Sequence, residues 1–313
     1  MLSKDNKKLT DILEEFLLYK KSQGNCCERT EKDYRYHIKK LLEDSEDILI
    51  EKSLESGIIR NFAKLNNKSA VTYNMRYKYL NCFFNWCTEN DYLSYNPLKK
   101  LKLKKRKENS RAKDIKIDIL KDLLNIIDLK TYYGLRNYTI IIISLDCGIR
   151  PNELLRTEIK DYNFYTNELK VRKEISKTSQ ERILPLSPFV VDTIKKLISV
   201  TPKDWKGNFI FYTIDGNLLS SSIWSKIMLR YSKQLGYDIS AYNLRHAFAI
   251  NYLRNGGNIF SLQRIMGHSN LSMTQRYLAL SQVDIIQQHK IATPINDLIK
   301  RNTKIINLFK ERK

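Results

Sequence analysis

The 313-residue sequence has no long hydrophobic run. Short apolar runs such as Ile140–Ile143 cannot cross a bilayer, because a spanning helix needs about 20 apolar residues. The first residues, Met-Leu-Ser-Lys-Asp-Asn-Lys-Lys, lack the apolar segment of a secretory signal. We therefore expect a cytoplasmic protein without a membrane segment.

Cysteine and histidine are both scarce. The five cysteines are odd in number and show no paired metal-ligand spacing, which favours reduced thiols over a disulfide framework. The four histidines lie far apart in the sequence. Because a zinc-type site needs several ligands brought together, we expect no metal site.

Acidic residues are few relative to basic ones. There are 55 Lys and Arg against 34 Asp and Glu, and the formal net charge is +21. An excess of this size predicts a polyanionic partner, either nucleic acid or an anionic membrane. A solvated lysine-rich surface is the less favoured explanation. A membrane binder has little support, because no basic amphipathic helix with a strong apolar face dominates the chain.

Residues 1–98 have the pattern of an all-helical domain. Apolar residues recur at helical spacing in four segments, and the first of these stops near Gly24. Thr30 and Asp33 form a plausible capping start for the second helix, and the fourth helix runs from about Ser69 to Asn90. Its basic and aromatic residues suit either phosphate contacts or the edge of the bundle core. They are Tyr73, Arg76, Tyr77, Lys78 and Tyr79.

Residues 99–113 are predicted to be a basic interdomain linker, after Asn96-Pro97 ends the helical domain. The segment has nine basic side chains and one acidic side chain, so we expect no apolar face there. Such a charge run is either a solvated tether or a segment that follows a phosphate backbone.

Residues 114–313 predict a second, mixed domain. Helical patterns near 117–127 and 138–145 precede three short strands, which we place at Tyr162–Tyr165, Leu169–Ile175 and Arg182–Leu186. Helical spacing then returns at 188–201 and 220–235. The predicted fold class is mainly α with a small antiparallel β-sheet. An amphipathic C-terminal tail, residues 281–313, packs either on its own domain or on a neighbouring subunit.

The residues best suited to chemistry lie between positions 242 and 277. The chain reads Tyr242-Asn-Leu-Arg245-His246, then Gly-His268, and Tyr277 follows nine residues after His268. Three helical patterns carry them. The first runs from near Ala241 to Gly256-Gly257, the second ends at Gly267, and the third opens behind Ser269 and Asn270 and carries Tyr277.

This order resembles the C-terminal signature of the tyrosine recombinase, or phage integrase, family and its Xer-like two-domain members. That signature is His-x-x-Arg, then Gly-His, then a tyrosine nine residues on. Upstream, Arg150 with a glutamate three residues later resembles the first arginine box of the family. Lys177, in a predicted hairpin turn, best matches its catalytic lysine. Lys173 is a weaker match, because we place it inside a strand.

The resemblance implies a helical (SAM-like) core-binding domain followed by an α+β catalytic domain. It implies site-specific recombination of double-stranded DNA by a homo-oligomer, a tetramer in the synapse, without a cofactor. Tyr277 would be the nucleophile that leaves a 3′-phosphotyrosyl link, and Lys177 the general acid. Arg150, Arg245 and His268 would bind the phosphate oxygens.

Tyr242 is the one departure, since the family usually has histidine at this position. Its hydroxyl could donate a hydrogen bond in place of the ring N–H, or the ring could only pack at the start of its helix. We therefore include Tyr242 among the candidate catalytic residues, and we expect His246 to be a supporting residue.

Two alternatives stay open at this stage. One is a catalytically impaired DNA-binding member of the same family, and the other is a topoisomerase IB-like relaxing enzyme. We expect no arm-type DNA-binding domain ahead of the helical bundle, which favours a simple two-domain enzyme.

Overall fold

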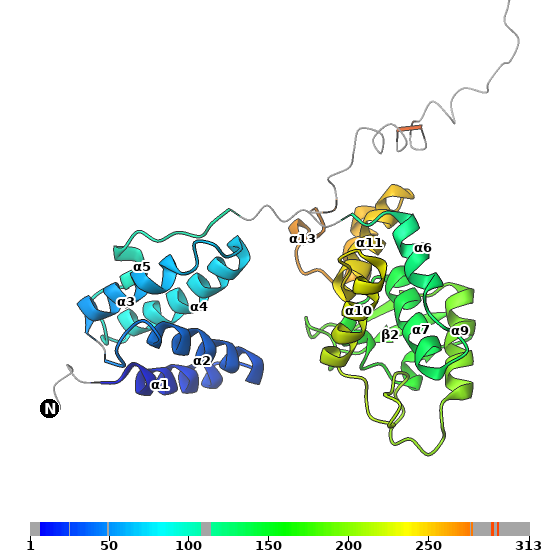
Figure 1. Cartoon of the computed structure of the whole chain (residues 1–313), viewed down its shortest axis with the longest axis horizontal. Coiled ribbons are helices and arrows are strands. Elements are labelled where there is room, and N and C mark those ends of the chain that lie inside the picture. Colours follow the sequence, from blue (N-terminus) through cyan, green and yellow to red (C-terminus); the bar gives the residue numbers. More distant parts are fainter. Residues whose placement is uncertain are drawn as a thin grey trace, which may run out of the picture. The chain divides into compact units, whose positions relative to one another are not determined.

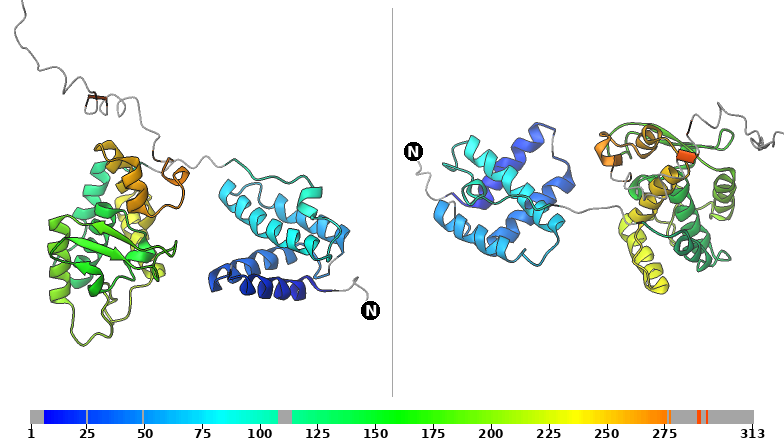
Figure 2. Two further views of the ribbon diagram at one scale, coloured as in Figure 1. Left: turned by 180° about the vertical axis from the view of Figure 1, so that it is seen from behind. Right: turned by 90° about the horizontal axis from the view of Figure 1, so that it is seen from above.

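A computed structural model describes residues 7–24, 26–48, 50–107, 114–275, 277, 289–290 and 293. The chain divides into two compact units, Met1–Ser110 and Arg111–Lys313. Figure 1 shows both units, and Figure 2 gives two further views. Within the described ranges, no helix combines the length and the apolar character that a membrane crossing requires. Most of the C-terminal tail lies outside the described residues, and so does the packing predicted for it.

The first unit is all helical. Its elements are α1 (Leu9–Ser22), α2 (Glu28–Leu42), α3 (Glu51–Ala63), α4 (Ala70–Glu89) and the short α5 (Pro97–Lys100). Their apolar stripes meet in one core, in which Phe16 and Phe83 are fully buried. The predicted start of the second helix is wrong, because α2 begins at Glu28 and Thr30 lies inside it.

Part of the mixed basic and aromatic set on α4 belongs to the core. Ser69 caps this helix by accepting a hydrogen bond from the Thr72 amide at 3.2 Å. Tyr73, Arg76 and Tyr79 are all buried. Of the two roles left open by the sequence, these three residues take the structural one.

The basic segment after residue 98 packs on the first unit more than its charge suggests. Leu101 and Leu103 contact the helical core, so the expectation that no apolar face forms is wrong. The Asn74 side chain makes two hydrogen bonds with the Arg106 backbone, at 2.8 and 2.9 Å. The Arg106 guanidinium also lies 3.9 Å from the centre of the Tyr73 ring. The chain is therefore anchored to this unit as far as Arg106.

The second unit combines several helices with a small three-stranded sheet. Its helices are α6 (Ile117–Asn125), α7 (Tyr132–Cys147), α8 (Pro151–Leu154), the 3-10 helix η2 (Ile159–Asp161), α9 (Pro188–Val200), α10 (Ser221–Leu235), α11 (Ala241–Arg254), α12 (Ile259–Met266) and α13 (Ser272–Gln275). The strands are β1 (Tyr162–Asn163), β2 (Glu168–Val171) and β3 (Arg182–Pro185), antiparallel in the order β1-β2-β3. This confirms the predicted fold class.

Helix α7 is the central element of this unit. It contacts both α9 and α11 (Figure 1). Four consecutive isoleucines, Ile140–Ile143, are buried along it. Because the helix is surrounded, its sequence is apolar on several faces rather than along one stripe. It ends at Gly148, whose left-handed φ of 60° suits glycine. A Cβ at this position would lie 2.2 Å from the Phe248 ring, so the close contact with α11 also requires glycine.

The strands are shorter than the sequence predicts. Residues 172–181 form a loop between β2 and β3 rather than a continuation of β2. Lys173 lies in a turn of this loop, so our reason for ranking it below Lys177 is wrong. The registers Leu169↔Leu184 and Val171↔Arg182 place Leu169, Val171 and Leu184 in the core.

Candidate active site

Arg150 sits at the junction between α7 and α8. It follows the turn at Gly148 and is the N-cap of α8, whose first residue is Pro151. Its side chain is buried, with Nη1 donating to Glu153 Oε1 at 3.0 Å and Nη2 donating to the Gly267 carbonyl at 2.7 Å. These two bonds orient the guanidinium plane between α8 and the end of α12.

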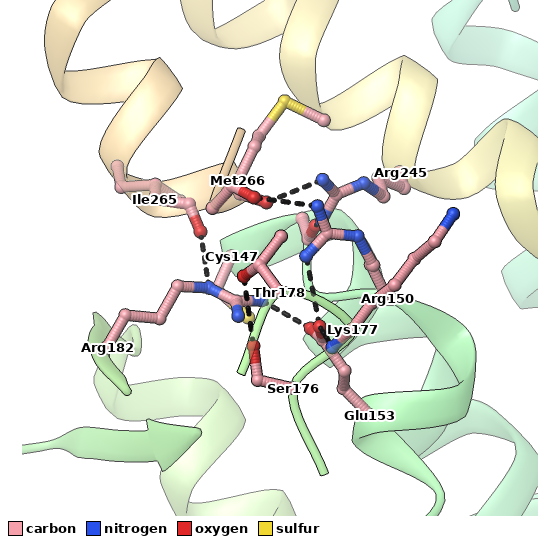
Figure 3. A network of polar contacts seen from close by, with 12 residues as sticks. Cys147, Arg150, Glu153, Ser176, Lys177, Thr178, Arg182, Arg245, Ile265 and Met266 are labelled. Atoms are coloured by element: carbon pink, nitrogen blue, oxygen red, sulfur yellow. Dashed lines mark hydrogen bonds and ion pairs between the residues drawn. The ribbon is translucent and has the colours of Figure 1, made fainter. Parts of the chain in front are cut away.

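Arg245 comes from the first turns of α11. Ser240 and Asn243 form a reciprocal capping box that fixes the start of this helix. The buried Arg245 guanidinium donates to the Gly148 carbonyl and, at 2.7 Å, to the Met266 carbonyl. Arg150 and Arg245 therefore both bind the chain around Gly267, and Figure 3 shows the two side chains converging there.

Burial and charge act together on Arg245. Desolvation, followed by the nearby positive charge of Arg150, lowers the pKa of Arg245 from its ordinary 12.5 to about 9. The group is still protonated at neutral pH. Two neighbouring cations that are shielded from water are stabilised by an anion between them. The pair Arg150 and Arg245 is therefore suited to bind an anion.

His268 continues the network from Arg245. It follows Gly267, which ends α12 in the left-handed conformation with φ of 59°. Its Nε2 lies 3.1 Å from Arg245 Nη2, and its Nδ1 lies 2.8 Å from the Thr274 hydroxyl. Thr274 is fully buried on α13, so the imidazole is held from both sides.

Tyr277 lies beside His268, just beyond the end of α13. The sequence predicts that the third helix carries Tyr277. The helix ends at Gln275, so this prediction is wrong. Its ring is parallel to the His268 ring, with 6.5 Å between centroids, and only 4% of the residue is exposed. The hydroxyl lies 2.7 Å from Nδ1 of His246. The structure thus brings Arg150, Arg245, His268 and Tyr277 into one connected group.

Glu153 and Arg182 complete the buried part of the site. Glu153 accepts from Arg150, from Arg182 Nη2 and, at 3.2 Å, from the Lys177 amide. Arg182 Nε also donates to the Ile265 carbonyl at 3.0 Å (Figure 3). Burial raises the pKa of Glu153, but the Arg182 hydrogen bond and the charges of Arg182 and Arg150 outweigh it and lower the pKa overall.

Sequence reasoning did not identify Arg182 as part of the site. The signal available was a basic residue at the start of a strand that immediately follows the Lys177 loop. This signal alone does not predict whether the arginine is buried or exposed. Only the fold places β3 against α12. The Arg182 side chain packs against Gly267, so a Cβ added to Gly267 would lie 3.2 Å from it.

Lys177 is exposed in the loop between β2 and β3. Its backbone amide is bound to Glu153, which anchors the loop to the two arginines. Within the described part of the chain, its ammonium group has no hydrogen-bond partner, and Figure 3 shows the side chain extending past Arg150. A lysine of this kind, fixed at its backbone and free at its tip, can reach a ligand bound to the arginines.

Among the candidate residues, Tyr242 is the least closely associated with this group. It lies in the first turn of α11, and 51% of it is exposed. Its side chain makes no hydrogen bond among the described residues. It shares the start of the helix with Arg245, so it lies at the rim of the site.

A hollow of about 700 Å³ opens beside this network. Arg182, Gly267 and His268 contribute to its lining, together with residues of the Lys177 loop. In the described part of the network, Arg150 and Arg182 share the single carboxylate of Glu153, and Arg245 is bound by main-chain carbonyls. The site is therefore electropositive, and its chemistry is that of an anion-binding centre with a tyrosine hydroxyl beside it.

Comparison with known proteins agrees with this chemistry. Residues 114–283 match the family model described as "Phage integrase family". The chain belongs to the phage integrase family. It is a site-specific DNA recombinase of the tyrosine class.

Relatives cover nearly the whole chain. The chain is 25% identical to the tyrosine recombinase XerD of Listeria monocytogenes serotype 4b (strain F2365), over 90% of this chain and 98% of the relative. It is 28% identical to the tyrosine recombinase XerA of Pyrococcus horikoshii, over 86% of this chain and 88% of the relative.

Solved structures support the fold. The integrase of the transposon Tn1549, solved in complex with a circular intermediate DNA, superposes with a TM-score of 0.71 at 20% identity. The match covers 90% of this chain and 98% of that one. At this identity, the likeness supports the shared two-domain fold.

Proposed function

We propose that this recombinase cuts and rejoins double-stranded DNA through a 3′-phosphotyrosyl link formed on Tyr277. The observation that carries the proposal is the single network in which Arg150 binds the Gly267 carbonyl and Arg245 contacts His268, with the ring of Tyr277 beside it. A scissile phosphate bound by the arginines would lie next to a phenol hydroxyl. No other described tyrosine shares this combination of neighbours.

Each residue has a distinct part in the proposed reaction. The Tyr277 oxygen attacks phosphorus, and the bond to the 5′-oxygen breaks. Arg150 and Arg245 hydrogen-bond the nonbridging oxygens as negative charge builds there, and His268 Nε2 does the same. Lys177 delivers a proton to the departing 5′-oxygen. The phosphodiester energy is kept in the tyrosyl ester, so rejoining needs no external energy source.

The first unit and the basic segment after it supply the rest of the DNA contact. The overall charge of +21 favours binding along a phosphate backbone, because each neutralised phosphate releases counterions. Exchange between two duplexes requires four strand cleavages, and Tyr277 supplies one nucleophile per chain. We therefore propose a homotetramer in the synapse, acting on DNA in the cytoplasm.

Covalent trapping tests the proposal directly. The purified protein is incubated with nicked duplexes whose central segment is randomised, and DNA in detergent-resistant adducts is recovered and sequenced. A nick beside the cleavage site lets the short fragment that bears the released 5′-hydroxyl diffuse away, so the adduct accumulates. We expect enrichment of one pair of inverted half-sites joined to protein at a 3′-phosphate.

The Tyr277→Phe variant is the matched control. It keeps the ring that packs beside His268 but lacks the attacking oxygen, so we expect normal DNA binding in a mobility-shift assay and no adduct. Adduct formation by this variant at the wild-type level would remove Tyr277 from the nucleophile position. Relaxation of supercoiled DNA with one site, without exchange between two sites, would favour a topoisomerase instead.

A further inference from the structure

His246 contacts the oxygen atom that performs the attack. Its Nδ1 lies 2.7 Å from the Tyr277 hydroxyl, with 5.6 Å between the two ring centroids. This is the geometry of a strong hydrogen bond and within the reach required of a general base. The phenol is buried, so this ring nitrogen rather than bulk water is beside its proton.

The position of His246 on α11 explains why it reaches the phenol. Successive residues of an α-helix are rotated by about 100°, so Arg245 and His246 project in neighbouring but different directions. Arg245 faces Gly148 and Met266, where the phosphate would bind. His246 faces Tyr277. One helix therefore positions a phosphate ligand and a base for the nucleophile side by side.

The other nearby histidine is engaged elsewhere. Nε2 of His268 lies 3.1 Å from Arg245, and its Nδ1 lies 2.8 Å from Thr274. The His268 ring is parallel to the Tyr277 ring, with 6.5 Å between centroids, which is a packing contact between the ring faces. Tyr242, which replaces the expected histidine, is half exposed and makes no hydrogen bond with Tyr277.

We propose that His246 is the general base of the cleavage step. This inference rests on the proposed role of Tyr277 as nucleophile. With the ring hydrogen on Nε2, the Nδ1 lone pair accepts the phenol hydrogen bond, and it takes the proton as the oxygen attacks.

The proton and electron balance of the step closes within the site. The phenol O–H bond breaks and an N–H bond forms at Nδ1. The oxygen electron pair forms the bond to phosphorus, the bond from phosphorus to the 5′-oxygen breaks, and Lys177 supplies a proton to that oxygen. The added positive charge on His246 arises while negative charge grows on the phosphoryl oxygens. In rejoining, His246 returns the proton to Tyr277.

Substitution by asparagine separates proton transfer from positioning. The Oδ1 atom of asparagine can occupy a place close to that of Nδ1 and accept the same hydrogen bond, but it cannot take the proton. We expect His246→Asn to bind the trapped duplex normally and to lower the single-turnover rate of adduct formation by about 10²-fold to 10⁴-fold. A rate for His246→Asn within threefold of wild type would overturn the proposal.

A more acidic nucleophile provides the second readout. Tyr277 is replaced by a fluorinated tyrosine, whose phenol loses its proton more readily and needs a base less. We expect the loss caused by His246→Asn to shrink at least tenfold in this background. The loss caused by the matched variant His268→Asn, which affects a phosphate contact, should not change. Equal losses at position 246 with both nucleophiles would show a purely structural role.

An experiment on the protein with His246 intact covers the case in which the variants do not fold. A series of fluorinated tyrosines at position 277 is compared by single-turnover rate at one pH. With a general base present, the rate should change much less than about tenfold per unit of phenol pKa. A full tenfold dependence would overturn the inference. Absence of any adduct with ordinary Tyr277 would instead reject the proposed nucleophile.

Discussion

Both units bury arginine, but they surround it differently. In the first unit, Arg76 donates to His37 Nδ1 at 2.9 Å and to Asn61 Oδ1 at 2.7 Å. Asn61 in turn donates to the Asp44 carboxylate at 2.8 Å, which closes the network. Desolvation and the charge of Arg76 lower the pKa of His37 to about 4, so this histidine is neutral.

The second unit compensates its buried positive charge only in part, through Glu153. Arg245 is bound by backbone carbonyls, and after desolvation the largest effect on its pKa comes from another cation, Arg150. Arg76 and Arg245 both lose hydration on burial. The hydrogen bonds of Arg76 are accepted by neutral side chains. A buried cation with completed side-chain partners stabilises one packing arrangement. A pair of cations that shares one carboxylate and is otherwise held by main-chain oxygens is suited to accept an added anion, and this is the proposed difference between the structural network and the binding site.

Removing the one carboxylate of the site should have the largest effect on stability. Glu153→Gln leaves Arg150 and Arg182 without a buried counter-charge, and we expect a loss of about 3–5 kcal/mol in the unfolding free energy. Urea denaturation measures it. Glu14→Gln, which breaks an exposed pair with Arg35, is the control in the first unit and should cost at most about 1 kcal/mol. A Glu153 loss no larger than the control would contradict the comparison.

The same variant has a pH signature. The folded-state pKa of Glu153 is below its ordinary 4.5, so its stabilisation is present above that value and is lost as the pH falls through the lower folded pKa. Wild-type stability should therefore decline in this acidic range more steeply than that of Glu153→Gln. Parallel declines would show that Glu153 does not carry the effect.

Exchange of arginine for lysine in each unit gives the sharpest contrast. Arg245→Lys loses the fork of donors at the phosphate, and we expect adduct formation to slow by about 10²-fold to 10³-fold. Arg76→Lys cannot reach both His37 and Asn61, so it should cost about 1–3 kcal/mol of stability. Its adduct rate at saturating DNA should equal that of wild type. A chemical defect in Arg76→Lys would show that the two networks do not differ in role.

Exposed lysines in the segment after α5 test whether it binds DNA. Neutralising four of them should weaken binding to all sequences alike and lower the slope of log affinity against log salt by about 0.9 for each phosphate that is no longer neutralised. They are Lys102, Lys104, Lys105 and Lys107. The control removes the same charge from lysines that already pair with carboxylates. These are Lys7, Lys32, Lys40 and Lys64. Equal slopes in both variants would make the segment a tether.

Tyr242→Phe should have the smallest effect. A half-exposed hydroxyl at the rim can offer one hydrogen bond to a phosphate, which is worth about 1 kcal/mol, so cleavage should slow roughly tenfold at most. Tyr242→His should retain more activity than the phenylalanine variant. Single-turnover rates of the two variants decide the point, and a phenylalanine enzyme as fast as wild type would exclude Tyr242 from the site.

Much of the fold follows from local signals in the chain. Apolar spacing, Ser69 as a cap and glycines at 148 and 267 place most helix ends within a few residues, because each signal acts over one or two turns. The order and spacing of Arg150, Arg245, His268 and Tyr277 likewise identify the family. Failures occur where local signals compete, as at Thr30 and in the loop that holds Lys173.

The tertiary structure alone decided which polar residues are partners. Charge spacing in the basic segment gave no sign that Leu101, Leu103 and Arg106 would pack on the first unit. Arg182 and His246 lie 29 and 31 residues from Glu153 and Tyr277, the residues they bind. A contact over that separation depends on how α11, α12 and β3 pack, and no pattern within one helix or strand encodes it. The sequence determined the chemical groups, and the packing decided which of them touch.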